Sequence, residues 1–156
     1  MITYVKNQNI LTTNCIGIVN FINVNGIVEK SNNSQSMMKN RFPNNYKLYQ
    51  KQKEDLKLKI GYIFTCTDRN ILTNQEKIIF NFPYKHDHTN SSQVDYISKG
   101  LKYFDYLMSV YTDEILPNVA IPNLKNEFNL DDYVQIKKLF NFHLSESNKI
   151  FVIYDT

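Results

Sequence analysis

The sequence predicts a three-layer α/β/α fold, in which a mixed β-sheet lies between helices on both of its faces. Short apolar runs rich in β-branched residues alternate along the chain with segments whose apolar residues recur every three or four positions. The first pattern is typical of buried strands and the second of amphipathic helices. No internal repeat, linker or low-complexity segment interrupts the 156 residues. We therefore expect residues 1–156 to form a single domain.

The strands are expected from apolar runs and from the residues that end them. Residues 2–5 alternate as in a first strand, and residues 16–22 form a nearly continuous apolar run, typical of a central strand covered on both faces. Residues 77–82 are expected to end at Pro83, because proline lacks the N–H that pairing requires. The other expected strands are residues 58–66, followed by a turn at 68–70, residues 119–121, ended by Pro122, and residues 149–154.

The clearest helix is expected at residues 94–111, where apolar residues recur every three or four positions. Ser92 and Asp95 form a capping-box pattern at its start. Two earlier helices are expected at residues 35–41 and 46–55. Asn129 is expected to cap a later helix, which presents Tyr133, Ile136 and Phe140 on one face.

Composition and charge narrow the class of protein. The net charge is only +3, and lysines and arginines are scattered rather than clustered as in a nucleic-acid-binding tract. No apolar run approaches the roughly 20 residues needed to span a membrane, and residues 1–6 look like a strand rather than a signal peptide. Cys15 and Cys66 lie inside apolar runs and are expected to be reduced core thiols, which favours a cytoplasmic protein without a membrane partner.

Residues 15–43 are expected to build a ligand site. An apolar strand leads into a loop that contains Gly26 and then into a short helix, an arrangement that often binds anions through loop amides and the positive end of the helix. Ligands of such sheets bind at the C-terminal ends of central strands. We therefore expect three loops, residues 25–34, 83–90 and 122–129, to meet there.

Several short motifs, in order, resemble those of macrodomains, the ADP-ribose-binding fold, over nearly the whole chain. Residues 9–11 resemble the Gly-Asp/Asn-Leu turn, and residues 18–26, IVNFINVNG, resemble the segment V-N-x-x-N-x-x-G. Residues 38–43, MKNRFP, resemble the F-K-x-x-(Y/F)-P helix. Residues 81–85, NFPYK, are similar to N-F-P-T-K, residues 120–124, AIPNL, to A-I-P-x-L-G, and residues 130–131 to the start of L-D-W.

In position, Lys85 after the N-F-P strand resembles the lysine found in one branch of the macrodomains. That branch includes the DarG antitoxin and the terminal ADP-ribose glycohydrolase. The resemblance implies that Lys85 attacks the anomeric carbon of the distal ribose and forms an imine-like adduct, while Asp131 assists proton transfer. This chemistry requires no metal and no other cofactor. The resemblance also implies a set of ligand-binding residues: Asn9 at the adenine, Asn23 and Asn25 at the distal ribose, and Ile10, Gly26, Lys30, Asn123, Leu124, Lys125 and Asn126 around them.

The two phosphate loops depart from the family pattern. The first keeps only Gly26 of the glycines around G-x-M-G-K-G, and the second reads KNEFN at residues 125–129, where the family has G-x-G. Glycine lets backbone amides approach a diphosphate closely, and asparagine replaces it in part because it tolerates positive φ. The residues expected to act in this way are Asn32, Asn33 and Asn126; Lys30 and Lys125 are expected to attract a diphosphate, and Glu29 and Glu127 to repel it.

Plainer interpretations stand beside these assignments. Lys85 is one of many lysines, which are usually solvated surface charges. Asn23 and Asn25 belong to an asparagine-rich chain, and Asp131 fits the favourable position of an acidic residue at a helix start. Residues 86–88, HDH, are a weak pattern for a metal site.

Two functions are therefore open. The retained lysine favours an ADP-ribosyl glycohydrolase that acts on a modified nucleic-acid base, including ADP-ribosylated DNA, or on a protein side chain. Its pathway would include a toxin or a host ADP-ribosyltransferase. The missing glycines favour a non-catalytic macrodomain that binds ADP-ribose or a protein partner.

Overall fold

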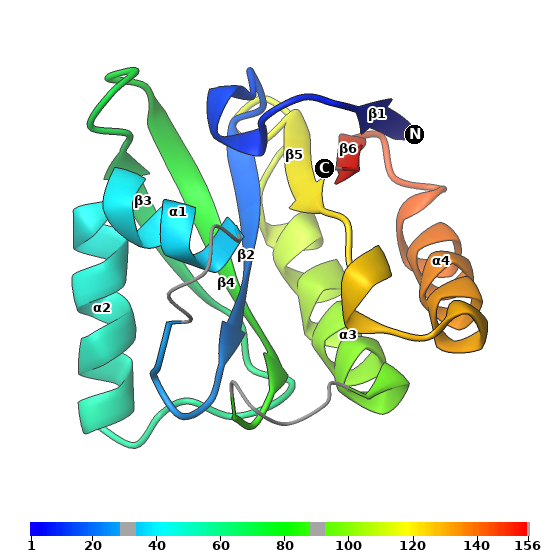
Figure 1. The fold of residues 1–156 in the computed structure, drawn as a ribbon. Coiled ribbons are helices and arrows are strands. Elements are labelled where there is room, and N and C mark those ends of the chain that lie inside the picture. The colour runs from blue at the N-terminus through cyan, green and yellow to red at the C-terminus, as the bar shows by residue number, and fades with distance from the viewer. Residues whose placement is uncertain (29–33, 88–92, 156) are drawn as a thin grey trace.

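The computed structural model describes residues 1–28, 34–87 and 93–155 (Figure 1). Within them, the strands form one six-stranded sheet in the order β1-β6-β5-β2-β4-β3. Neighbouring strands are parallel except for β3 and β4, which are antiparallel. The strands are β1 (Ile2–Lys6), β2 (Gly17–Asn23), β3 (Phe64–Arg69), β4 (Glu76–Lys85), β5 (Asn118–Pro122) and β6 (Ile150–Asp155).

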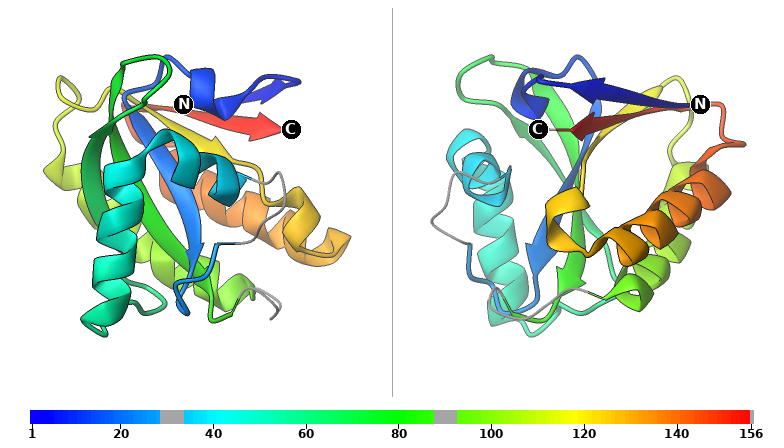
Figure 2. Two further views of the ribbon diagram at one scale, coloured as in Figure 1. Left: turned by 60° about the vertical axis from the view of Figure 1, so that its left-hand side comes forward. Right: turned by 45° about the vertical axis from the view of Figure 1, so that its right-hand side comes forward.

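Helices cover both faces of the sheet (Figure 2). The first pair, α1 (Ser34–Arg41) and α2 (Pro43–Glu54), lies on one face, and the second pair, α3 (Val94–Val110) and α4 (Leu130–Leu144), lies on the other. Two 3-10 turns, η1 (Ile10–Thr12) and η2 (Lys125–Glu127), follow β1 and β5. The predicted three-layer α/β/α fold is confirmed.

The core is divided by the sheet, and β2 contributes to both halves. Ile18 packs in a cluster with Met38 and Phe42 of the α1 side. Val19 and Phe21 pack in the larger cluster that includes α3 and α4. Side chains of a strand alternate between its faces, so a strand buried on both faces is apolar along its length. Every residue of β2 is buried, which confirms the central strand expected from residues 16–22.

Helix α3 approaches β4 closely because position 100 has no side chain. A Cβ placed on Gly100 would lie 2.2 Å from Cζ of Phe82, far inside van der Waals contact. Ile97, Leu101 and Phe104 of the same helix are buried against the sheet. The apolar periodicity of residues 94–111 therefore identified the buried face correctly.

The expectation for β3 was wrong at both ends. Residues 58–63 are not in a strand, and β3 begins at Phe64 and continues through Asp68 and Arg69, where a turn was expected. The cause is a contact with α2. The buried carboxylate of Asp68 accepts hydrogen bonds from Asn45 N at 2.9 Å and Asn44 Nδ2 at 3.0 Å, at the start of that helix. This contact and the pairing with β4 hold Asp68 in the sheet.

The prediction that Pro83 ends β4 was also wrong. The strand continues to Lys85. Its pairing with β3 ends at Asn81, so Pro83 lies where β4 is paired with β2 alone. Proline is tolerated where one side of a strand makes no ladder. The β2–β4 register shifts between Ile22 and Asn23, immediately after the residue paired with Pro83.

Helix starts were predicted with mixed success. Gln93 is the N-cap of α3, without a side-chain capping bond, and Ser92, the expected cap, lies outside the described residues. Helix α2 starts at Pro43, earlier than expected, because proline is favoured in the first turn. The Asn129 cap of α4 is confirmed, since its Oδ1 accepts a hydrogen bond from Asp132 N at 2.8 Å.

The cysteines are free, but only Cys15 is a core thiol, because Cys66 is half-buried. The pKa of Cys66 is raised by burial and by the neighbouring Asp68. Among the described helices, none combines the length and the apolar character that a membrane crossing requires.

Candidate functional site

The connections of β2 and β5 indicate where a ligand site lies. These two strands are parallel neighbours in the sheet. The strand that pairs with β2 on its other side is β4, and the strand that pairs with β5 on its other side is β6, so the chain continues in opposite directions across the sheet from the two strands (Figure 1). Such a reversal leaves room for a ligand beyond the C-terminal ends of the strands. The residues that end β2, β4 and β5 are therefore the candidate site.

Backbone hydrogen bonds join the ends of β2 and β4. Asn23 pairs with Lys85 in the sheet. Beyond this pair, Val24 N donates to Lys85 O and Asn25 N donates to His86 O, each at 3.0 Å. The predicted meeting of the first two loops is therefore confirmed for the parts that the structure describes.

The loop after β2 is held in shape by its own polar groups. Asn23 is fully buried, and its Nδ2 donates to Ile27 O at 2.7 Å. The Oδ1 of Asn25 accepts from Ile27 N at 3.1 Å. Gly26 has a φ of +78°, a conformation that glycine adopts without strain, and its carbonyl accepts from Gln50 Nε2 at 2.8 Å. The glycine expected in this loop therefore has a conformational role.

Lys85 is a buried cation at the end of β4. The residue is 4% exposed, so its interpretation as a solvated surface charge is wrong. Its Nζ lies 3.6 Å from Oε2 of Glu127 and 5.1 Å from the ring centre of Tyr84. A buried ammonium group requires an opposite charge or polar partners, because it has lost much of its hydration. Glu127 supplies such a charge from the loop after β5.

A hollow of about 320 Å³, which includes space open to solvent, lies beside this ion pair. Two residues of its lining are hydrogen-bonded: the Nε2 of Gln35, near the start of α1, donates to the Tyr84 hydroxyl at 3.2 Å. The hollow therefore joins segments from β2, β4, α1 and the loop after β5. Its lining residues are Phe21, Gln35, Tyr84, Pro122, Asn123, Leu124 and Glu127.

The loop after β5 forms a helical turn rather than a glycine-like nest. The Oδ1 of Asn123 accepts from Lys125 N at 2.7 Å, and Asn123 N donates to Tyr154 O at 3.0 Å. Lys125 and Asn126 are exposed in η2. Among the described non-glycine residues, only Asn7, Leu56 and Asn74 have positive φ. The expectation that Asn126 replaces glycine through positive φ is therefore wrong.

The remaining predicted site residues lie apart from the lining of this hollow. Asn9 caps η1, where its Oδ1 accepts from Leu11 N at 3.0 Å, and Ile10 is buried in the α1-side core. Asp131 is exposed in the first turn of α4. The predicted residues Lys30, Asn32 and Asn33, with Glu29, lie outside the described residues.

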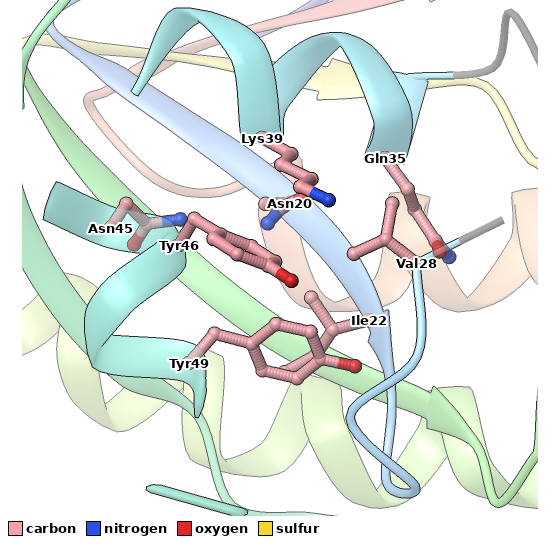
Figure 3. A pocket seen from close by; sticks show the side chains of 8 residues that line it. All are labelled: Asn20, Ile22, Val28, Gln35, Lys39, Asn45, Tyr46 and Tyr49. Carbon is pink, nitrogen blue, oxygen red and sulfur yellow. The ribbon is translucent and has the colours of Figure 1, made fainter. Parts of the chain in front are cut away.

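A second hollow, of about 260 Å³, lies between β2, α1 and α2 (Figure 3). Lys39 Nζ lies 4.6 Å from the ring centre of Tyr46 on one side of it. The Tyr49 hydroxyl donates to Asn23 O at 2.7 Å, and burial raises the pKa of Tyr49. Gln35 lines both hollows. The wall of the second hollow therefore holds the end of β2 through Tyr49.

Three asparagines form a buried network beside the second hollow. Asn81 Oδ1 accepts from Asn20 Nδ2 and from Asn45 Nδ2, each at 3.0 Å. Asn81 Nδ2 donates in return to Asn45 Oδ1 at 2.7 Å. The network ties β2, β4 and α2 together beneath the candidate site.

Known proteins resemble this chain in sequence and in structure. No protein-family model matches the chain. A DNA ADP-ribosyl glycohydrolase of Thermus aquaticus is 36% identical over 102 residues, which are 65% of this chain and 27% of that protein. The chain therefore spans about a quarter of the length of this curated relative.

The macrodomain of Thermus aquaticus DarG has a TM-score of 0.83 and 26% identity, over 100% of this chain and 99% of that chain. This chain has a DarG-like macrodomain fold. The macrodomain of Mycobacterium tuberculosis DarG shows the same fold, with a TM-score of 0.79, 24% identity and coverage of 100% and 98%. Thermosipho africanus DarTG, solved in complex with ADP-ribose, has a TM-score of 0.78 and 18% identity, over 97% of this chain and 41% of that chain.

In this macrodomain, sequence reasoning missed two residues that the structure places at the site. Glu127 was considered only as a charge that repels a diphosphate, whereas it pairs with Lys85. Gln35 was considered only as the start of a helix, whereas it contacts Tyr84. Both contacts join segments that are distant in the sequence, so no local sequence pattern predicts them. The one available signal was that Glu127 follows β5 in a loop expected at the same edge as Lys85.

Residue types that bind metals occur among the described residues of this macrodomain. Among them, no group of three or more histidine, cysteine, aspartate or glutamate side chains is arranged to hold a metal ion. His88, part of the weak HDH pattern, lies outside them.

Proposed function

We propose that this macrodomain is an ADP-ribosyl glycohydrolase that removes ADP-ribose from a modified base of DNA, with Lys85 as the nucleophile. The proposal is carried by the position of Lys85, a buried lysine at the C-terminal end of β4 beside an open hollow. Two likenesses support it: the curated relative named a DNA ADP-ribosyl glycohydrolase and the structure of DarTG in complex with ADP-ribose.

The chemistry follows from the properties of an amine at this position. A neutral Lys85 amine attacks the anomeric carbon of the distal ribose and displaces the acceptor, and water later releases ADP-ribose from the adduct. Asp131 is proposed as a second catalytic residue, as the family resemblance implies. The proposed ligand contacts are Asn9, Ile10, Asn23, Asn25, Gly26, Lys30, Asn123, Leu124, Lys125 and Asn126.

The substrate has to be produced by an enzyme that transfers ADP-ribose to DNA. We propose a toxin ADP-ribosyltransferase for this step, because the structural relatives are parts of DarG and DarTG. A host ADP-ribosyltransferase is the alternative source, and an acidic protein side chain is the alternative acceptor. Both alternatives can be tested with the same purified protein.

One observation favours a second function, a macrodomain that binds without cleaving. The loop after β5 contains no glycine and forms the η2 turn, and its Glu127 carboxylate lines the hollow. A carboxylate facing a diphosphate disfavours its binding. In that case the fold would serve as a binding module for a different nucleotide or for a protein.

The deciding experiment combines binding and turnover. Calorimetric titration with ADP-ribose, with AMP and ADP as controls, is expected to give micromolar affinity, about −8 kcal/mol. Release of ADP-ribose from an oligonucleotide ADP-ribosylated on a base is then followed by chromatography. Lys85→Ala is expected to abolish release while leaving ADP-ribose affinity within a few-fold. Lys102→Ala, at an exposed position of α3, is the matched control and is expected to retain full activity.

The results separate the two functions. Binding without release by the wild-type protein would reject the glycohydrolase and favour the binding module. Absence of binding by a folded protein at high ligand excess would reject both ADP-ribose functions. Release by Lys85→Ala at the wild-type rate would remove Lys85 from the mechanism.

A further inference from the structure

The ion pair between Lys85 and Glu127 has a consequence for the chemistry of the site. Glu127 ends η2, and its side chain, 39% exposed, lines the hollow while its Oε2 lies 3.6 Å from Lys85 Nζ. The lysine end of the pair is buried and the carboxylate end reaches open space. A group bound in the hollow can therefore contact the Glu127 carboxylate, which lies beside Lys85.

Lys85 needs a proton acceptor before it can react. An ammonium group has no lone pair, so it cannot form a bond to the anomeric carbon. A carboxylate at ion-pair distance can accept the ammonium proton after a small movement and can then donate it to another group. Glu127 has this position, whereas Asp131 is exposed in the first turn of α4, where the helix dipole already accounts for an acidic residue.

We propose that Glu127 relays a proton from Lys85 to the departing acceptor, and that this relay adapts the site to acceptors linked through nitrogen. The inference rests on the proposed glycohydrolase function and goes beyond it by naming the class of bond that is cleaved. It also assigns to a loop residue a role that the family resemblance places on Asp131.

The Lys85 ammonium gives a proton to the Glu127 carboxylate and becomes a neutral amine. The amine nitrogen forms a bond to the anomeric carbon as the bond from that carbon to the acceptor nitrogen breaks, and the departing nitrogen takes the proton from Glu127. Water then attacks the anomeric carbon, and the bond to Lys85 breaks. The proton released by water passes through Glu127 to the amine, which restores the ammonium–carboxylate pair.

The chemical difference between acceptors explains the expected selectivity. A ring nitrogen of a base leaves as a strongly basic anion unless it is protonated during departure. A carboxylate acceptor leaves as a weak base, since the pKa of a glutamate side chain is about 4.3, and it needs no proton. Loss of the relay is therefore expected to harm cleavage of a nitrogen linkage much more than cleavage of an ester.

The experiment compares Glu127→Gln with wild type on two substrates. One is an oligonucleotide with ADP-ribose on a ring nitrogen of a base, and the other is a peptide with ADP-ribose esterified to glutamate. Glutamine keeps the shape and the hydrogen-bonding capacity but cannot carry the proton. We expect kcat/KM on the nitrogen linkage to fall about 100-fold or more and on the ester less than 10-fold. Affinity for ADP-ribose is expected to remain or to rise, because a negative charge is removed.

Two further variants test the interpretation. Glu127→Asp keeps the carboxylate and is expected to recover part of the activity on the nitrogen linkage. Glu114→Gln, at an exposed glutamate that precedes β5, is the matched control and is expected to behave as wild type. The pH profile of kcat/KM on the nitrogen linkage is expected to lose its acidic limb in Glu127→Gln only.

The possible outcomes distinguish this inference from the proposed function. If wild type cleaves neither substrate, the glycohydrolase proposal itself fails. If wild type cleaves the nitrogen linkage and Lys85→Ala does not, the proposed function stands. Under that condition, full activity of Glu127→Gln, or an equal loss on both substrates with an unchanged pH profile, overturns the relay.

Discussion

Asn23 of β2 and Lys85 of β4 are partners in the sheet although the preceding residue of β2, Ile22, pairs with Pro83. Tyr84 is therefore the extra residue of β4 between these two pairs. A bulge of this kind redirects side chains at the end of a strand. Here it brings a buried asparagine and a buried lysine to the same edge, where the proposed chemistry needs them.

The hydrogen bond from Tyr49 to Asn23 is expected to stabilise this edge. Tyr49→Phe removes the donor and leaves the buried Asn23 carbonyl without it, so the free energy of unfolding should fall by about 1–3 kcal/mol. ADP-ribose affinity should also fall, because Asn23 is a proposed contact. Urea unfolding and calorimetry measure the two effects. Tyr46→Phe, on the same helix, is the control, and equal stability of the two variants would contradict the prediction.

Gly26 is expected to resist substitution for two separable reasons. Its φ of +78° strains any L-residue, and a Cβ there would lie 2.2 Å from Cδ of Lys53. Gly26→Ala should therefore lower the free energy of unfolding by about 1–2 kcal/mol and weaken ADP-ribose binding. Adding Lys53→Ala should recover the share of the lost unfolding free energy that the collision with Lys53 causes. The share caused by the positive φ should remain. Full recovery in the double variant would show that φ does not matter.

The asparagine network predicts strong coupling between Asn45 and Asn81. Asn81→Leu, which keeps the branched shape of the side chain, leaves the amides of Asn20 and Asn45 without their acceptor and should cost about 2 kcal/mol or more. The double variant with Asn45→Leu should be less destabilised than the sum of the two single variants, because it removes both partners together. Urea unfolding of all four proteins measures the coupling. Additive effects would contradict a cooperative network.

Lys77 predicts a pH dependence of stability. Its buried Nζ donates to Thr13 O at 2.9 Å and to Cys15 O at 2.6 Å, and desolvation lowers its pKa below the ordinary value of 10.5. Between the lowered pKa and 10.5 the unfolded chain holds more protons than the folded one. The contribution of this group to stability therefore rises with pH and is lost as pH falls through the folded pKa.

Lys77→Met removes this contribution and both hydrogen bonds. The variant should be less stable than wild type by about 1–3 kcal/mol at pH 7, and the difference should grow towards pH 10. Urea unfolding at several pH values measures both effects. The raised pKa of Cys66 makes its contribution to stability fall as pH rises. This contribution is the same in both proteins, so it cancels from the difference between their free energies of unfolding. A constant difference across this range would reject the titration of Lys77.

Much of the scaffold could be predicted because its signals are local. The apolar run of β2, the periodic face of α3 and the Asn129 cap of α4 each depend on neighbouring residues, and all three are confirmed. The failures have a common cause. Asp68 and Pro83 carry turn or stop signals, but pairing with β4 and with β2 holds them in strands.

By itself, the sequence determined the three-layer fold, the buried face of the main helix and the order of motifs that places Lys85 at the end of a strand. The first two features follow from periodicity along the chain, and the third follows from the resemblance of its motifs to those of macrodomains. Only the tertiary structure decided that Lys85 is buried, that Glu127 is its partner and that Gln35 closes against Tyr84. Such pairs form between segments that are distant in the chain, so strand order and register, rather than local propensity, decide which side chains meet.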